Sequence, residues 1–389
     1  MPKLLIFSSD PTYIGLARLP KALKIAGFEV AALCLEEAFL AKTRYLDQIF
    51  LLTKNSLTKT MNADKLLKQL VEVMTIWSPD LLIFGDESTV AFGHYLVQNA
   101  AKFKILLPDS ILQVIKSSLG DPEFFEATLL KNKTLEVAHG LGVRAPVAVS
   151  VTTSKAALEV AEKSGYPIVL KKEFGCSGVG VKVCSDQADL LATLPDFLPR
   201  HISPFKAQIQ RFMKRDWMPK PKVLSVQQFI KGVTVMYPVV ALNGEVLAGF
   251  AVVKHLTISP TGPSTVIRFI NHPEMQATAI ALIKEFKFTG FASLEFILEE
   301  GTNLAYLIEA NPRPTTVFHL SNLVGIDPSK ALFARLQGQK WEPQFTVEKE
   351  LSIALFPQEW KRDSSSENLH QFYHDVPWDD PELLKAYIL

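Results

Sequence analysis

The stretch FASLEFILEEGTNLAYLIEANPR, from Phe291 to Arg313, determines how the rest of the chain is interpreted. It contains two short apolar runs separated by the polar sequence EEGTN, a pattern that predicts an antiparallel hairpin with its turn near Thr302. Residues two apart in a strand share a face, so Glu309 and Asn311 point the same way, and Glu295 lies across from Glu309 on that face. Two carboxylates placed opposite each other repel, so a positive charge is expected between them.

Two interpretations of this acidic face remain open from the hairpin alone. Carboxylate and amide oxygens without a nearby Cys or His are the ligands that suit Mg²⁺ or Mn²⁺. The alternative is a solvated polar face on which Arg313 acts as the counter-ion.

The totals describe an ordinary globular protein rather than a binder of polyanions. At 389 residues the chain is long enough for two or three folding units, and 48% of its residues are hydrophobic and 21% charged. The net charge of +1 supplies no field that would favour nucleic acid or an anionic membrane. The three cysteines are odd in number and lack metal-ligand spacing, and neither a signal peptide nor a membrane-spanning apolar run is apparent, so we expect a cytoplasmic protein.

The first 115 residues alternate strand and helix patterns. Buried-strand runs at Lys3–Phe7, Phe28–Leu35 and Leu81–Glu87 are separated by amphipathic segments, which predicts a doubly wound α/β domain. The glycine fingerprint of a dinucleotide site is missing, because only Gly15 is present after the first strand.

Asp86 and Glu87 end the third of these strands. Open α/β sheets bind ligands at that edge, but acidic residues also cap the start of a following helix. The sequence favours neither role over the other.

A second informative stretch, GYPIVLKKEFGCSGVGVKV, runs from Gly165 to Val183. It predicts a strand, a loop of small residues and a returning strand. Glycines allow backbone N–H groups to surround phosphate oxygens, and Lys171 would add positive charge to the same phosphates. It is not a P-loop, since the lysine precedes the glycines; a plain glycine hairpin with a surface lysine is the alternative.

The remaining patterns complete the chain. Residues 191–222 are rich in proline and basic residues and predict either a mobile lid or a solvated connection. Strand patterns follow, with a hairpin signal at Asn243–Gly244 and one predicted strand at Glu245–Lys254, and they predict an antiparallel sheet. The tail after Trp341 contains one further strand pattern, SIALF.

Taken together and in this order, these motifs resemble the ATP-grasp superfamily, the fold of carboxylate–amine ligases and biotin carboxylase. The likeness covers roughly Lys131 to Gly338. YPIVLKKEFGCSGVGVKV resembles the phosphate-binding hairpin of that family, VQQFIKG its adenine-pocket segment, and LEF with IEANPR its pair of metal-binding strands.

The resemblance implies a mixed α/β and α+β architecture. Its expected parts are a doubly wound N-terminal domain at 1–115, an ATP-grasp domain at 116–340 divided into a small lid-like subdomain at about 130–230 and a larger antiparallel-sheet subdomain at about 231–340, and a C-terminal extension at 341–389.

The resemblance also implies site residues, with ATP and Mg²⁺ or Mn²⁺ as cofactors. The implied metal ligands are Glu295, Glu309 and Asn311. The implied nucleotide-binding residues are Lys131 (with Lys133 as the alternative), Lys171, Ser177, Gly178, Val179, Gly180, Gln227, Gln228, Phe229 and Ile230. The implied catalytic residues are Arg313, facing the transferred phosphate, and Lys254 and Arg268, which could equally be surface charges.

Two positions depart from the family pattern. Val317 lies near the place where biotin carboxylase has a glutamate that acts on bicarbonate, which argues against a biotin-dependent role. Many ligases have Gly-x-Glu after the adenine segment, whereas this chain has Gly232-Val233-Thr234, which weakens a ribose contact there.

The implied activity is an ATP-dependent ligase that joins a carboxylate to an amine through an acyl phosphate. The alternatives are another phosphoryl transfer on the same fold, kinase-like or carboxylating, and a non-catalytic nucleotide-binding protein. The expected partners are a small-molecule carboxylate and amine, with no nucleic acid and no membrane. A homodimer is compatible with the sequence.

Overall fold

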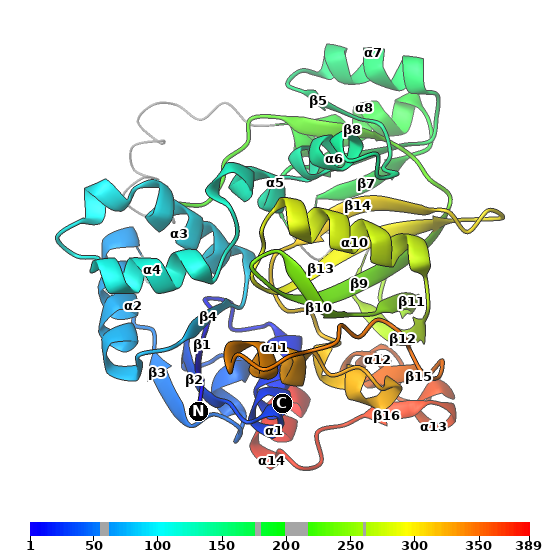
Figure 1. Cartoon of the computed structure of the whole chain (residues 1–389). Coiled ribbons are helices and arrows are strands. Elements are labelled where there is room, and N and C mark those ends of the chain that lie inside the picture. The colour runs from blue at the N-terminus through cyan, green and yellow to red at the C-terminus, as the bar shows by residue number, and fades with distance from the viewer. Residues whose placement is uncertain (55–61, 176–179, 199–216, 260–261) are drawn as a thin grey trace.

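The computed structural model describes residues 1–54, 62–175, 180–198, 217–259 and 262–389. Within these residues the strands form three sheets, which we call the first, the small and the central sheet. Figure 1 shows the first sheet with its helices at the lower left, the small sheet at the top and the central sheet on the right. No helix in the described ranges is long and apolar enough to cross a membrane.

The first sheet confirms the predicted doubly wound N-terminal unit. Its strands are parallel, and three of the four are buried because each is a continuous apolar run, whereas the edge strand is largely exposed. In spatial order they are β3 (Gln48–Leu51), β2 (Glu29–Cys34), β1 (Lys3–Phe7) and β4 (Leu81–Phe84). Since β2 and β4 lie on opposite sides of β1, the crevice expected to bind ligands opens at the carboxyl ends of β1 and β4.

The helices around this sheet follow the predicted amphipathic segments. They are η1 (Ile14–Arg18), α1 (Leu19–Ala26), η2 (Phe39–Lys42), α2 (Ala63–Trp77), α3 (Glu87–Gln98), η3 (Ala100–Phe103) and α4 (Asp109–Ser117). Asp86 is the N-cap of α3, since its carboxylate accepts a hydrogen bond from the Thr89 N–H at 2.9 Å. Of the two roles predicted for Asp86, the structure shows the helix cap.

The central sheet is buried on both sides of its long strand β9 (Gly232–Leu242). Val235, Tyr237 and Val239 pack on the side of α10 (Pro273–Glu285), whereas Met236 and Val240 belong to the core that includes α11 (Pro328–Leu336). The order is β14 (Ala305–Asn311), β13 (Gly290–Glu299), β9, β11 (Ala251–Thr257), β12 (Ser264–Ile270), β15 (Ser352–Leu355) and β16 (Tyr373–Asp375), with β10 (Glu245–Gly249) paired to β9.

The predicted single strand Glu245–Lys254 is wrong in one respect. The structure divides it at Phe250 into β10 and β11, both of which pair with β9. Phe250 is fully buried and packs against Phe269 and Phe318, so the strand bends where an aromatic ring enters the core.

The small sheet has a core of its own. Its strands, in the order β5 (Ala148–Val151), β8 (Leu224–Gln228), β6 (Ile168–Lys172) and β7 (Val181–Cys184), are antiparallel and pack against α7 (Ser154–Ser164) and α8 (Gln187–Phe197). The connection to the first sheet consists of η4 (Pro122–Phe124), α5 (Phe125–Leu129) and α6 (Lys131–Gly140).

The interpretation of residues 191–222 as one solvated connection is wrong at both ends. Leu190 and Leu194 are buried and form an apolar face of α8. The helix continues past Pro195 to Phe197 because this face packs in the core. At the other end Trp217 is buried against Phe92 of α3 and donates a hydrogen bond to the Ser88 carbonyl at 3.0 Å. The predicted mobile segment between them lies outside the described residues.

The C-terminal segment is part of the fold rather than an appendage. β15, the predicted SIALF strand, pairs with β12, and the chain continues through α12 (Gln358–Arg362), α13 (Asn368–Gln371) and β16 to α14 (Pro381–Ile388). Tyr387 of α14 donates a hydrogen bond to the Ile14 carbonyl at 2.6 Å.

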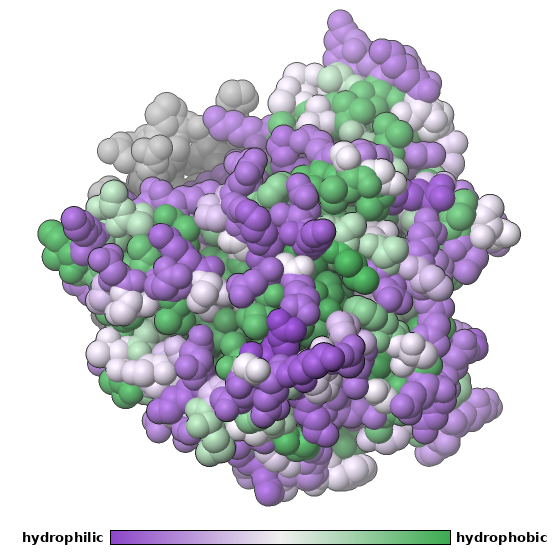
Figure 2. All heavy atoms as spheres, viewed as in Figure 1, coloured by the Kyte–Doolittle hydropathy of each residue, from purple (hydrophilic) through white to green (hydrophobic). Residues whose placement is uncertain are grey.

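The surface matches the net charge near zero, because hydrophilic and hydrophobic residues are interspersed on the face that Figure 2 shows.

A buried ionic cluster fastens this segment to the rest of the molecule. Asp375 lies 2.7 Å from the Arg18 guanidinium of η1 and 2.9 Å from the ring of His319, which belongs to η5 (Phe318–Val324). Burial disfavours ionisation of the Asp375 carboxyl, but His319 and Arg18 outweigh it and lower its pKa.

We predict that Asp375→Asn destabilises the protein, because it leaves the buried Arg18 guanidinium without its counter-ion. The expected loss is about 3–5 kcal/mol in the free energy of unfolding, measured by urea denaturation. Glu245→Gln removes the partner of Arg335 in an exposed pair and should change the same quantity by less than about 1 kcal/mol. Equal effects of the two substitutions would contradict the role of the cluster.

Candidate nucleotide and metal site

Most of the residues singled out from the sequence lie around one cavity of about 380 Å³ between the small and central sheets. Its walls also include Tyr13, from the loop after β1. The predicted residues that line it are Lys131, Lys171, Gln227, Gln228, Phe229, Ile230, Lys254, Glu295, Glu309, Asn311 and Arg313. Gly180 precedes β7 beside the Lys172 side chain, and Ser177, Gly178 and Val179 lie outside the described residues.

The hairpin of β13 and β14 has the predicted register. Glu295 lies directly across from Glu309, and Ser293 lies across from Asn311. The side chains of Glu295, Glu309 and Asn311 therefore gather on one face of the hairpin, as the two-residue period of a strand requires.

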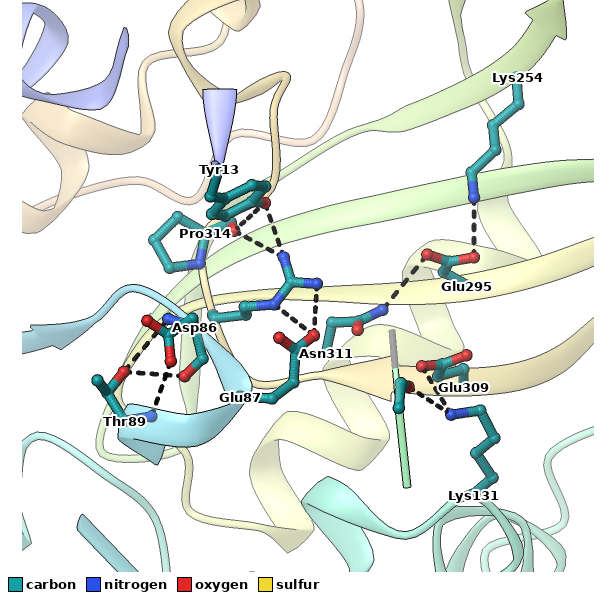
Figure 3. Close-up of polar contacts among 12 residues, drawn as sticks. Tyr13, Asp86, Glu87, Thr89, Lys131, Lys254, Glu295, Glu309, Asn311 and Pro314 are labelled. Carbon is teal, nitrogen blue, oxygen red and sulfur yellow. Dashed lines mark hydrogen bonds and ion pairs between the residues drawn. The ribbon is translucent and has the colours of Figure 1, made fainter. Parts of the chain in front are cut away.

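Lysines from two other elements lie beside these carboxylates (Figure 3). The Lys254 Nζ of β11 is 2.9 Å from Glu295 Oε2, and the Asn311 amide donates to Glu295 Oε1 at 3.4 Å. The Lys131 Nζ of α6 is 3.3 Å from Glu309 Oε1 and donates to the Gly175 carbonyl at 2.8 Å. The positive charge expected between the carboxylates is thus supplied by the protein itself.

The two carboxyl groups differ in proton affinity because their surroundings differ. Burial raises the pKa of Glu309, and the nearby Glu295 charge adds to that effect against the attraction of Lys131 and Lys171. Burial acts the same way on Glu295, but Lys254, with Arg313 and Lys131, outweighs it and lowers the pKa of Glu295.

This set of oxygen ligands fits a magnesium ion that is also coordinated by a bound nucleotide. The described residues contain no group of three or more His, Cys, Asp or Glu side chains that could hold a metal by themselves. Mg²⁺ is usually bound through one or two carboxylates together with substrate phosphates. Here Glu295 and Glu309 would supply the two carboxylates, and the Asn311 amide would supply a further oxygen. A nucleotide phosphate would complete the coordination.

Lys171 of β6 also lines this cavity. Its side chain is buried, and this burial lowers the pKa of Lys171 to about 8 despite the nearby Glu309 charge. Of the two lysines left open in the helix α6, Lys131 is buried at the cavity, whereas Lys133 is half exposed and pairs with Glu136. Of the two, only Lys131 lines the cavity, so we keep it as the proposed nucleotide-binding lysine.

The segment Gln227–Ile230 lines the cavity. Val169, Val183 and Ile297 also line it and were not singled out from the sequence, although their alternation within strands is the signal that places them on the cavity side. The Gln227 side chain is 2% exposed, and its Nε2 has no hydrogen-bond partner among the described residues. A planar base with hydrogen-bonding edges matches such a slot.

The two predicted arginines are in different places. Arg313 is buried at the cavity, where it meets Glu87 and Tyr13. The prediction that Arg268 faces the nucleotide with Lys254 is wrong. Arg268 lies directly across from Val253, so it shares a face with Val253 and lies on the opposite face from Lys254, where it pairs with the exposed Glu350.

A family model described as the carbamoyl-phosphate synthase L chain, ATP binding domain, matches residues 131–327, just over half of the chain. The chain belongs to this family. The match begins at Lys131 and includes the small sheet and the β13–β14 hairpin, so the predicted membership of the ATP-grasp superfamily is confirmed.

Solved structures of other ATP-grasp proteins share the fold over 90% of this chain. The biotin carboxylase domain of 2-oxoglutarate carboxylase from Hydrogenobacter thermophilus, solved with MgADP and bicarbonate, is 18% identical, with 73% of that chain covered and a TM-score of 0.63. N5-carboxyaminoimidazole synthetase from Staphylococcus aureus with ADP is 13% identical, with 81% covered and a TM-score of 0.63. The L-amino acid ligase from Bacillus licheniformis is 17% identical, with 79% covered and a TM-score of 0.56. The coverage of 90% includes more than the ATP-binding domain, so the predicted fold class is confirmed for the chain as a whole.

The pKa of Lys171 generates a prediction about nucleotide binding. With a pKa of about 8, this amine is partly neutral at about pH 8 in the free protein, and a polyphosphate beside it would favour the ammonium form. Binding of Mg·ADP should therefore take up protons at that pH, and affinity should fall as the pH rises further. Calorimetry in buffers of different ionisation enthalpy measures this uptake.

Lys171→Ala should abolish the proton uptake and weaken Mg·ADP binding by about tenfold or more, because it removes a charged phosphate contact. Its melting temperature without nucleotide should stay close to that of the parent, since the buried charge is costly in the free protein. Lys172→Ala is the matched control, because the neighbouring lysine is exposed. Equal effects of the two substitutions would exclude Lys171 from the site.

Proposed function

We propose that this protein is an ATP-dependent ligase that activates a carboxylate as an acyl phosphate and joins it to an amine. The observation that carries the proposal is the joint arrangement at one cavity of Glu295, Glu309 and Asn311 with the cations Lys131, Lys171 and Arg313. Phosphoryl transfer needs positioning and neutralisation of charge more than covalent help from the protein, and this set offers both.

The residues divide the work by position. The slot at Gln227–Ile230 would hold the adenine, and Lys131 and Lys171 would hold the phosphates. Mg²⁺, held by Glu295, Glu309 and Asn311, would neutralise charge on the transferred phosphoryl group. Arg313 would stabilise that group where it meets the carboxylate.

The proposed steps balance as follows. A carboxylate oxygen of the substrate attacks the γ-phosphorus, and the bond from that phosphorus to the bridging oxygen breaks, which releases ADP. The amine nitrogen then attacks the acyl carbon, the carbon–oxygen bond to phosphate breaks, and the nitrogen loses a proton to solvent. The products are an amide, ADP and phosphate.

Carboxylation of an acceptor with bicarbonate is the second candidate, because two of the structurally similar proteins are a biotin carboxylase domain and an N5-carboxyaminoimidazole synthetase. Val317, near the place of the bicarbonate-directed glutamate of biotin carboxylase, is fully buried and apolar. This side chain supplies no base, which favours the ligase over biotin-dependent carboxylation.

The test is an ADP-release screen over pairs of carboxylates and amines, with a parallel bicarbonate arm and mass spectrometry of the products. An amide formed in equal amount with ADP supports the ligase. A carboxylated product, or a stable phosphorylated one, supports the second candidate or a kinase-like transfer. ATP binding without turnover over the whole panel would support a non-catalytic nucleotide-binding protein.

Glu309→Gln should keep the fold and lose most of the Mg²⁺-dependent turnover, about a hundredfold or more, because it removes a charged ligand and preserves the shape. Binding of Mn²⁺ in the presence of ADP, measured by electron paramagnetic resonance, should weaken in parallel. Glu300→Gln, at the exposed turn of the same hairpin, is the control. Unchanged Mn²⁺ binding in Glu309→Gln would move the metal elsewhere.

The division of the chain also remains a proposal, with limits at 1–115, 116–340 and 341–389. The separate core of the small sheet supports a lid-like subdomain within about 130–230. The cytoplasmic setting is proposed on the reduced state of Cys34 and Cys184, which are free and buried. A homodimer is proposed by analogy, because the Hydrogenobacter thermophilus domain was solved as a dimer.

A further inference from the structure

The Arg313 guanidinium is held by residues of the first domain, more than two hundred positions away in the sequence (Figure 3). Its Nε lies 2.6 Å and its Nη2 2.5 Å from the Glu87 Oε1. Its Nη1 donates to the Tyr13 hydroxyl at 2.7 Å, and the guanidinium carbon lies 4.9 Å from the centre of the Tyr13 ring. One carboxylate and one aromatic ring therefore fix the plane of this arginine.

Glu87 stands on a rigid support. The preceding residue, Asp86, accepts hydrogen bonds from the Ser8 hydroxyl at 2.9 Å and the Ser9 N–H at 2.5 Å, besides capping α3. The carbonyl of the following residue, Ser88, accepts the Trp217 indole N–H at 3.0 Å. The backbone on both sides of Glu87 is thus tied to β1 and to the segment that leads into β8.

The loop that carries Tyr13 lies against the segment that follows Arg313. The Tyr13 hydroxyl donates to the Pro314 carbonyl at 2.7 Å. A Cβ added at Gly15 would come within 2.3 Å of the Thr316 backbone, so only glycine permits this approach. The two segments meet at the carboxyl ends of β1 and β4, where the first sheet has its switch point.

We propose that Glu87 is a positioning residue, which holds the Arg313 guanidinium in the orientation that receives the phosphoryl group at the cavity wall. The proposal rests on the proposed function. It assigns to the first domain a part in phosphoryl transfer, with Tyr13 as the second support of the same arginine.

A purely structural ion pair accounts less well for this geometry. The Arg18–Asp375 pair is similarly buried and also joins distant segments, but neither residue lines the cavity. Arg313 and Tyr13 both line it, and Glu87 contacts Arg313 from the side of α3. An arginine fixed before its ligand arrives loses little side-chain freedom on binding, which is the benefit of preorganisation.

The experiment measures binding of inorganic phosphate to the Mg·ADP complex of the full chain by calorimetry, and so needs no acceptor substrate. In Glu87→Gln the guanidinium loses its ionic partner, so phosphate should bind about tenfold more weakly, while the affinity for Mg·ADP stays within about twofold. Tyr13→Phe keeps the ring and removes the hydroxyl, and should weaken phosphate binding by about threefold. Glu245→Gln, which breaks the exposed pair with Arg335, is the matched control and should leave both affinities unchanged.

The outcomes separate the two levels of the argument. If the parent protein does not bind Mg·ADP, the proposed function fails. If it binds Mg·ADP but its complex takes no phosphate, or if Glu87→Gln and Tyr13→Phe bind phosphate as the parent does, the role of Glu87 is overturned and the proposed function stands. If Glu87→Gln loses affinity for both Mg·ADP and phosphate, the variant no longer separates a positioning role from a structural one, and Tyr13→Phe decides between them. A normal phosphate affinity in Tyr13→Phe then overturns the proposal, and a weakened phosphate affinity with normal Mg·ADP binding supports it.

Discussion

The structure depends on the repulsion between Glu295 and Glu309, which the hairpin register places directly opposite each other. Two carboxylates on paired positions of a buried hairpin face need cations beside them if both are to stay ionised, because the low local dielectric strengthens their repulsion. Lys254 of the central sheet and Lys131 of α6 supply these cations, and Lys171 of the small sheet adds a third positive group. The charges that neutralise the two carboxylates therefore come from separate parts of the fold.

The same constraint is the reason why we propose that the site takes a metal together with a nucleotide. A divalent cation between the carboxylates would take over the role of Lys254 and Lys131, and these ammonium groups would then need new anionic partners. Nucleotide phosphates would provide such partners at the place where Lys131 and Lys171 lie. In this proposal the lysines would pair with phosphates while the metal pairs with the carboxylates, and the charges at the site would stay balanced.

Much of this arrangement could be predicted from the sequence because it depends on strict local periods. The two-residue period of β13 and β14 determines which side chains share a face, and it placed Glu295, Glu309 and Asn311 correctly. Arg268 was suggested by the resemblance and not by a period, and its face could not be determined from the sequence, because the pairing of β12 with β11 was unknown and a shift of one residue changes the face. The edge strand β3 and helix α8 were missed for another reason. β3 is largely exposed and so lacks a buried-strand pattern, and the Pro195 of α8 is outweighed by the buried Leu190 and Leu194.

Contacts between residues far apart in sequence were the least predictable part, and they include the surroundings of Arg313. Glu87 could be recognised as a residue at the end of a parallel strand, yet its partner could be identified only after the first and central sheets were placed together. The sequence assigned no role to Gly15 once the dinucleotide fingerprint was found to be missing, and in the structure this glycine permits close packing against Thr316. A glycine that permits close packing and a glycine that lets the backbone approach a phosphate cannot be told apart in a sequence. Only the segment that lies next to the glycine in the structure distinguishes the two roles. Here that neighbouring segment, Pro314–Thr316, comes just after Arg313, so the loop that carries Tyr13 and Gly15 packs beside the arginine that Tyr13 contacts.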